Sequence, residues 1–192
     1  MDTNLLKSAF EAVNPSIGAE EWHFLQERLI PLNLKRKENF LEEGQRQKYI
    51  GFVEQGLIRE YFVDKEGNEN TVWFFREHQF ITDYPSFIRN LPTRNTFTCL
   101  EPTQLILIPR DIIFQSYERY PSLDHFGRLI AERVLIRLQD RIDDFHFLSA
   151  EERYVKYIQS YPDLFQRISL THLSSFLGIT RPSLSRIRRN LS

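Results

Sequence analysis

Residues 171–192, THLSSFLGITRPSLSRIRRNLS, contain four arginines and no acidic residue, in a chain whose formal net charge is only -1. A glycine, Gly178, lies in the stretch. Helices often end at a residue with a left-handed backbone conformation, and this residue is commonly glycine. Thr180 follows as a good N-cap for a second helix. Apolar residues recur at helical spacing on both sides of the glycine: Leu173, Leu177, Leu184 and Ile187. This spacing predicts two short helices joined by a tight turn, a helix-turn-helix.

Pro182 lies inside the predicted second helix, where proline usually costs about 3 kcal/mol. With Thr180 as the N-cap, the helix begins at Arg181 and Pro182 falls in its first turn, where amide hydrogens have no intrahelical partners. The proline is therefore compatible with the helix. The outer face of this helix and the N-terminal end of the preceding one are the predicted DNA-binding surface, with these candidate residues: Ser169, Thr171, Thr180, Arg181, Ser183, Ser185, Arg186, Arg188 and Arg189.

The four arginines are expected to differ in role. Arg181 and Arg186 lie near the start of the helix, where arginine can match the two acceptors of a guanine in the major groove. Arg188 and Arg189 lie farther along and suit phosphates better. An arginine-rich helix can also be a solvated face, so charge alone does not decide; the register of the apolar positions with Gly178 favours DNA binding.

The region from about Leu32 to Pro109 has a different pattern, with short aromatic and branched runs separated by turn residues. Its clearest part is residues 57–75, LIREYFVDKEGNENTVWFF, where two strand-like runs flank a polar turn and predict a β-hairpin. About eight short strands at this spacing favour a compact barrel or jelly roll. The first 30 residues are predicted to be helical, with Ser16 as an N-cap, and to pack as an appendage.

A single long helix is predicted between the strand-rich region and the C-terminal segment. Two explanations for its apolar stripe compete: it covers the chain's own β domain, or it pairs with the same helix of a second subunit. We favour pairing, because a helix of this length outruns a small barrel. The predicted dimer interface consists of residues three or four positions apart: Leu123, Phe126, Ile130, Val134, Leu138, Ile142 and Phe145.

Several classes of protein are disfavoured by the sequence. No apolar run approaches the roughly 20 residues of a membrane span, and the N-terminus does not resemble a secretory signal, so a cytoplasmic protein is expected. The five histidines are scattered, Cys99 is the only cysteine, and no phosphate-binding glycine loop or nucleophile elbow occurs. We therefore expect no metal site, no catalytic residues and no enzymatic activity.

The order of these parts resembles the cyclic AMP receptor protein/FNR (Crp/Fnr) family of bacterial transcription regulators. The segment FLEEGQRQKYIGFVEQGLIREYFVDKEGNENTVWFF resembles that family's cyclic-nucleotide-binding β-roll, and GITRPSLSRIR resembles its recognition helix. The resemblance implies an α+β fold with a β-roll (a double-stranded β-helix or jelly roll) at residues 1–120, a long dimerisation helix at 121–147 and a helix-turn-helix at 148–192. It also implies a homodimer that binds palindromic double-stranded DNA, with RNA polymerase as a candidate partner. No association with a membrane is expected.

Three departures from the family pattern qualify this expectation. Pro182 stands where the recognition helix has glutamate, which puts that residue's base preference in doubt. The pairs that hold the cyclic phosphate and ribose become Thr82-Asp83 and Thr93-Arg94, so cyclic AMP is not expected to bind and no cofactor is required, although Arg94 could meet another anionic effector. No residues remain after the recognition helix for a full wing. The alternative function is a ligand-sensing or scaffold protein that uses the same fold for protein contacts without DNA.

Overall fold

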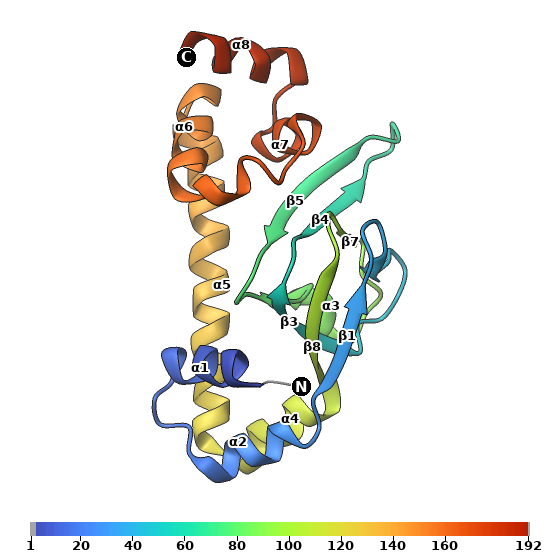
Figure 1. Cartoon of the computed structure of the whole chain (residues 1–192), viewed down its shortest axis with the longest axis vertical. Coiled ribbons are helices and arrows are strands. Elements are labelled where there is room, and N and C mark those ends of the chain that lie inside the picture. Colours follow the sequence, from blue (N-terminus) through green and yellow to red (C-terminus); the bar gives the residue numbers. More distant parts are fainter. Residues whose placement is uncertain (1–2, 192) are drawn as a thin grey trace. The chain divides into compact units, whose positions relative to one another are not determined.

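The computed structural model describes residues 3–191 of the chain, which form two compact units (Figure 1). The first, here called the β-roll unit, comprises Met1–Glu60 and Phe74–Val134. The second, here called the C-terminal unit, comprises Tyr61–Trp73 and Leu135–Ser192. The division therefore falls within the long helix and within the hairpin.

Eight strands form two four-stranded sheets, which confirms the predicted β-roll. One sheet has the order β1-β8-β3-β6 and the other the order β2-β7-β4-β5. The pairings β1 with β8, β3 with β8, β3 with β6 and β2 with β7 are all antiparallel. The strands are β1 (Ile30–Leu34), β2 (Asn39–Leu41), β3 (Tyr49–Gln55), β4 (Ile58–Val63), β5 (Glu69–Phe75), β6 (Phe80–Ile81), β7 (Thr96–Cys99) and β8 (Thr103–Pro109).

The hairpin between β4 and β5 forms as the sequence predicts. Asp64 fixes its turn, because the Oδ1 atom accepts hydrogen bonds from the backbone N–H groups of Glu66 and Asn68 at 3.0 and 2.8 Å. These and related bonds to Asn68 and Asn70 lower the pKa of the Asp64 carboxyl group. Gly67 has a φ of +83°, a conformation that glycine adopts without strain.

Helices cover the outer face of the β1-β8-β3-β6 sheet and share one core with it. Phe52 and Ile106 of the sheet pack with Phe10 and Phe126, whose rings are stacked 4.1 Å apart. The helices of the β-roll unit are α1 (Asn4–Val13), α2 (Ala19–Gln26), α3 (Tyr84–Arg89), α4 (Arg110–Arg119) and the first part of α5 (Pro121–Phe147). The N-terminal region is thus part of the core, and the expectation of an appendage is wrong, because α1 and α2 cover apolar sheet residues.

The N-terminal region also forms two helices, and Ser16 is not an N-cap. Helix α2 begins after Gly18, while the Ser16 hydroxyl donates to Oδ1 of Asn14 at 2.7 Å. The Asn14 amide in turn donates to the carbonyl of Ser122 at 2.8 Å. Ser16 is therefore occupied in the loop that ties the N-terminal helices to the start of α5.

Helix α5 has the length that its apolar stripe predicts, but the stripe has two different environments. Leu123 and Phe126 are 1% and 7% exposed, and they lie with Ile130 against the core of their own β-roll unit. Leu138 and Ile142, by contrast, are 47% and 49% exposed. The prediction that the whole stripe pairs with a second subunit is therefore corrected: its first three members are used within the chain.

The C-terminal unit contains the end of α5 and three further α-helices, α6 (Ala150–Ser160), α7 (Leu170–Leu177) and α8 (Arg181–Leu191), with a short 3-10 turn at Pro162–Leu164. A complete capping box begins α6: Ser149 accepts from the Glu152 N–H, and Glu152 accepts from the Ser149 N–H. Among residues 3–191, no helix is both long enough and apolar enough to cross a membrane.

Candidate nucleic-acid interface and effector site

The turn between α7 and α8 has the conformation that the sequence predicts. The Ser169 hydroxyl accepts a hydrogen bond from the His172 N–H at 3.1 Å and caps the start of α7. Gly178 ends the helix with a φ of +68°, and the Ile179 N–H returns to the carbonyl of Ser174 at 3.0 Å. A Cβ atom on Gly178 would lie 2.7 Å from Cε1 of Phe145 in α5. Glycine is therefore required here both by its backbone angle and by a close neighbour.

Two arginines bind the carbonyl groups left unpaired at the end of α7. Arg141 donates to the carbonyl of Phe176 at 3.0 Å, and Arg153 donates to that of Leu177 at 3.2 Å. The Arg141 guanidinium also lies 4.0 Å from the centre of the Phe176 ring. These contacts combine charge-assisted hydrogen bonds at a helix C-terminus with a cation–π interaction, and they fix α7 on α5 and α6.

Helix α8 begins at Arg181, as predicted. Thr180 caps it: Oγ1 accepts from the Ser183 N–H at 3.3 Å, and its carbonyl accepts from the Leu184 N–H at 3.0 Å. Leu184 is fully buried and anchors the inner face of the helix, while Pro182 lies in the first turn without breaking it.

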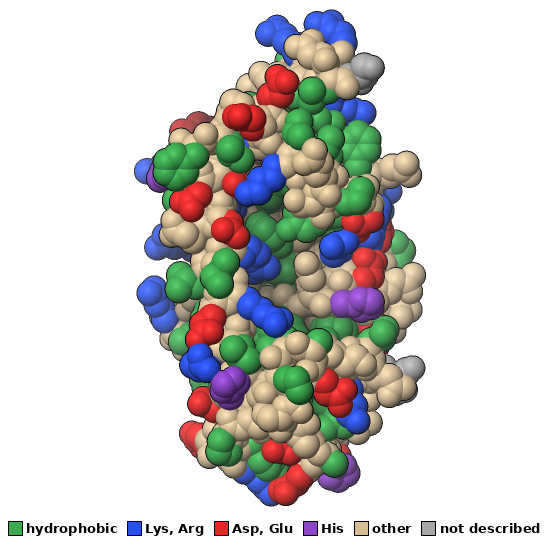
Figure 2. Space-filling model, turned by 90° about the vertical axis from the view of Figure 1, so that its left-hand side faces the viewer, with side chains coloured by type: hydrophobic (Ala, Val, Ile, Leu, Met, Phe, Trp, Pro, Cys, Tyr) green, Lys and Arg blue, Asp and Glu red, His purple; other side chains and the backbone are tan. Residues whose placement is uncertain are grey.

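The outer face of α8 carries three exposed arginines, Arg181, Arg186 and Arg189, together with exposed Ser185. Figure 2 shows Lys and Arg side chains gathered at the end of the view that corresponds to α8. Arg188 differs from the other three, because it is half-buried and its guanidinium lies 4.9 Å from the centre of the Phe165 ring. Arg188 therefore has a packing role in the unit, and its assignment to phosphate contact stays a prediction.

A contact within the C-terminal unit that the sequence did not reveal joins α7 to the hairpin. The Ser175 hydroxyl donates to the carbonyl of Glu69 at 2.9 Å and accepts from the Thr71 N–H at 2.8 Å. Beside it, the rings of Trp73 and Phe176 meet edge to face with centroids 5.8 Å apart. These partners are about 100 positions apart in the chain, so no local pattern could indicate them.

The predicted effector residues Thr82, Asp83 and Thr93 are brought together inside the β-roll unit, around a residue the sequence reasoning missed, Gln47. Oε1 of Gln47 accepts from the Asp83 N–H at 2.9 Å and from the Thr82 hydroxyl at 3.3 Å. The Thr93 hydroxyl donates to Oδ2 of Asp83. Asn95 extends the network: its N–H donates to Oγ1 of Thr93 at 3.0 Å.

Arg94 does not join this network, because its side chain is exposed. The Asp83 carboxylate already accepts a hydrogen bond from Thr93. None of the hydrogen bonds described above for this network involves an arginine. A phosphate would face a negative charge there and would compete with an internal hydrogen bond.

The sequence of residues 31–120 matches the family described as the cyclic nucleotide-binding domain. The match concerns the strand-rich segment, most of which lies in the β-roll unit. No curated protein matches the chain.

Solved structures with the same overall fold include transcription regulators. FixK2 from Bradyrhizobium japonicum is 15% identical, with a TM-score of 0.73 over 85% of this chain and 84% of that one. The c-di-GMP responsive global regulator CLP of Xanthomonas campestris is 15% identical, with a TM-score of 0.71 over 91% of each chain. The catabolite activator protein of Thermus thermophilus is 17% identical, with a TM-score of 0.60 over 95% and 86%. The chain therefore has the fold of Crp/Fnr regulators, as the resemblance predicts.

Proposed function

We propose that this protein is a DNA-binding transcription regulator of the Crp/Fnr type that acts as a homodimer on a palindromic site. The observation that carries the proposal is the arrangement of buried and exposed side chains on α8. Its inner face is anchored by buried Leu184, its start is capped by Thr180, and its outer face presents Arg181, Arg186 and Arg189 to solvent. A short rigid helix that displays guanidinium groups is suited to a major groove.

The second half of α5 supports the homodimer. Leu135 and Ile136, which the predicted stripe did not include, are 67% and 61% exposed. Leu135, Leu138 and Ile142 are separated by three and four positions, which is the spacing of a helix seam that pairs with a second helix. Figure 2 looks at the side on which α5 lies in Figure 1, and green hydrophobic side chains are interspersed there with charged ones. A paired seam would remove these side chains from water.

Cyclic AMP is not part of the proposed mechanism, because of the Asp83 network. If an effector binds the β-roll unit, its chemistry should differ from that of a cyclic phosphate. Titration calorimetry of the full chain with cyclic AMP tests this directly, and we expect no heat of binding at micromolar concentrations. A micromolar dissociation constant would contradict this part of the proposal.

The experiment that tests DNA binding is selection of bound fragments from a random DNA pool, followed by affinity measurements at several salt concentrations. A palindromic site with half-sites about 34 Å apart is expected, and affinity should fall steeply with salt. Arg186→Ala should weaken binding to the selected site by about 1–3 kcal/mol and relax one base position. Arg36→Ala, an exposed arginine of the β-roll unit, is the matched control and should leave affinity unchanged.

One result would reassign Arg186, and another would contradict the proposal. Equal loss of affinity for selected and random DNA in Arg186→Ala would assign the residue to a phosphate and not to a base. No recovered sequence, together with a partner interaction that barely responds to salt, would instead favour a scaffold that uses its helices for protein contacts.

A further inference from the structure

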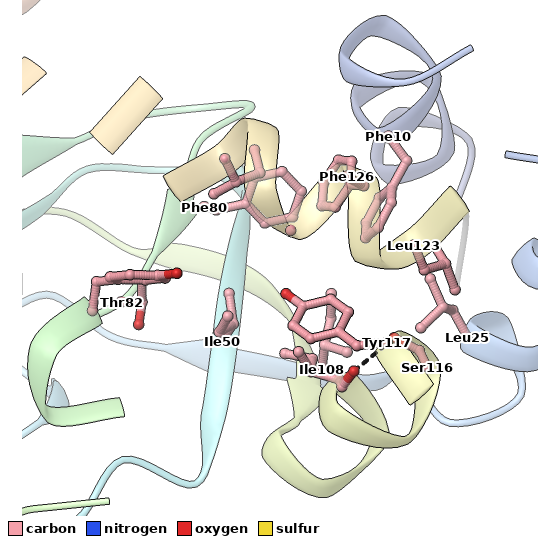
Figure 3. A pocket seen from close by; sticks show the side chains of 14 residues that line it. Phe10, Leu25, Ile50, Phe80, Thr82, Ile108, Ser116, Tyr117, Leu123 and Phe126 are labelled. Carbon is pink, nitrogen blue, oxygen red and sulfur yellow. Dashed lines mark hydrogen bonds between the residues drawn. The ribbon is translucent and has the colours of Figure 1, made fainter. Parts of the chain in front are cut away.

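A cavity of about 50 Å³ lies inside the β-roll unit at the foot of α5 (Figure 3). Its walls come from all five helices of the unit and from strands β3, β6 and β8. The sequence places these elements far apart, so the cavity is a product of tertiary packing. Its lining includes Phe10, Leu25, Ile50, Phe80, Ile108 and Phe126.

The cavity offers water few hydrogen-bond partners. The Ser116 hydroxyl on its wall already donates to the carbonyl of Ile113 at 2.7 Å, and the Thr82 hydroxyl donates to Gln47 at 3.3 Å. A buried water typically needs two to four partners, whereas apolar cavities stay dry and accept apolar guests. The lining therefore favours a mainly apolar molecule over water.

Two phenol hydroxyls also line the cavity, that of Tyr84 and, from α4, that of Tyr117. The Tyr117 hydroxyl points toward the middle of the lining side chains in Figure 3, and it makes no hydrogen bond with any of residues 3–191. Burial, with smaller contributions from Tyr84 and Asp124, raises the pKa of Tyr117 to about 12, so the phenol keeps its proton at neutral pH. Gly127 makes room for it, because a Cβ there would lie 2.6 Å from Cζ of Tyr117.

We propose that this cavity binds a small neutral molecule, mainly apolar and with one hydrogen-bond acceptor such as a ketone or aldehyde oxygen, which accepts from the Tyr117 hydroxyl. A volume of about 50 Å³ holds roughly three or four water-sized spheres, which corresponds to about four to six non-hydrogen atoms. The site adjoins the Asp83 network and shares Thr82 with it, but neither Asp83 nor Thr93 lines the cavity. The proposal does not depend on DNA binding, because binding is measured on the free protein.

The test uses two probes of similar size, cyclopentanone, which has an acceptor, and cyclopentane, which has none. Methyl groups of isoleucine in the full chain are labelled and followed by NMR during titration. Both probes should shift the signals of four lining residues saturably, while Ile58 and Ile168, which do not line the cavity, should stay in place. The four reporters are Ile50, Ile108, Ile113 and Ile130.

Two variants distinguish the contribution of the cavity from that of the Tyr117 hydrogen bond. Tyr117→Phe should weaken cyclopentanone binding about fivefold and change cyclopentane binding less than twofold, because only the ketone loses a hydrogen bond. Ile130→Phe should abolish binding of both probes by filling the cavity, whereas Ile136→Phe, at a 61% exposed position of the same helix, should not. Thermal unfolding of each variant checks that it is folded.

Two outcomes would overturn the proposal. The first is that wild-type protein shows no saturable shift, or shifts Ile58 and Ile168 as much as the lining residues. The second is that cyclopentanone binds Tyr117→Phe as tightly as wild type, which would remove the assigned hydrogen bond.

Discussion

The hydroxyl of Ser175 in α7 accepts a hydrogen bond from the backbone N–H of Thr71 in β5, at 2.8 Å. The same hydroxyl donates to the Glu69 carbonyl. A helix side chain thus takes the place of a neighbouring strand for two backbone groups of β5. Because unpaired backbone groups of a strand are costly, Ser175 holds the first helix of the helix-turn-helix to the hairpin together with the contact between Trp73 and Phe176.

Ser175→Ala should release this contact. Loss of both hydrogen bonds is expected to lower the free energy of unfolding by about 1–2 kcal/mol and to speed amide hydrogen exchange at Thr71 at least several-fold. Hydrogen exchange followed by NMR measures both quantities. Ser185→Ala, on the exposed face of α8, is the control and should leave exchange at Thr71 unchanged. Unaltered protection of Thr71 in Ser175→Ala would show that the contact does not hold the hairpin.

Gly178→Ala should destabilise the helix-turn-helix for two reasons that can be separated. An alanine at φ +68° costs about 1–2 kcal/mol, and its Cβ would also displace Phe145. Gly67→Ala isolates the first effect, since Gly67 has a φ of +83° and nothing within 4 Å of an added Cβ. Chemical denaturation should therefore show a larger loss for Gly178→Ala than for Gly67→Ala. Equal losses would mean that Phe145 moves aside freely.

Leu135→Lys should weaken the proposed dimer. A charge placed in a helix seam loses the burial of an apolar side chain and is repelled by its symmetry mate, so we expect at least a tenfold increase in the dimer dissociation constant. Sedimentation equilibrium measures it. Leu5→Lys changes an exposed leucine of α1, and its dissociation constant should equal that of wild type. If Leu135→Lys remains fully dimeric, the seam lies elsewhere.

Tyr117 should make stability fall at high pH. The pKa of its phenol is about 12 in the folded chain and near 10 in the unfolded one, so the folded state holds the proton more tightly. Its contribution is fully present below pH 10 and is lost as pH rises toward 12. The loss amounts to about 3 kcal/mol. Urea unfolding across this range should show a shallower decline in Tyr117→Phe than in wild type; parallel declines would contradict the assignment.

The sequence determined the parts of this protein that depend on local patterns. Gly178, Thr180 and Pro182 indicated where α7 ends and α8 begins, because left-handed backbone, capping and the first helical turn are set within a few residues. Short aromatic and branched runs indicated the strands, and the polar turn within residues 57–75 indicated the hairpin.

How those parts are used depends on contacts that form only in the folded chain. The spacing of the α5 stripe is the same throughout, yet Leu123 is covered by its own unit while Leu138 is exposed, since periodicity shows that a face is apolar and not what covers it. The structure likewise placed Gln47 beside Asp83 and left Arg94 in solvent, although Arg94 follows Thr93 directly in the chain. Contacts between residues tens of positions apart arise when the folded chain returns to the same place, and no local pattern in the sequence contains that information.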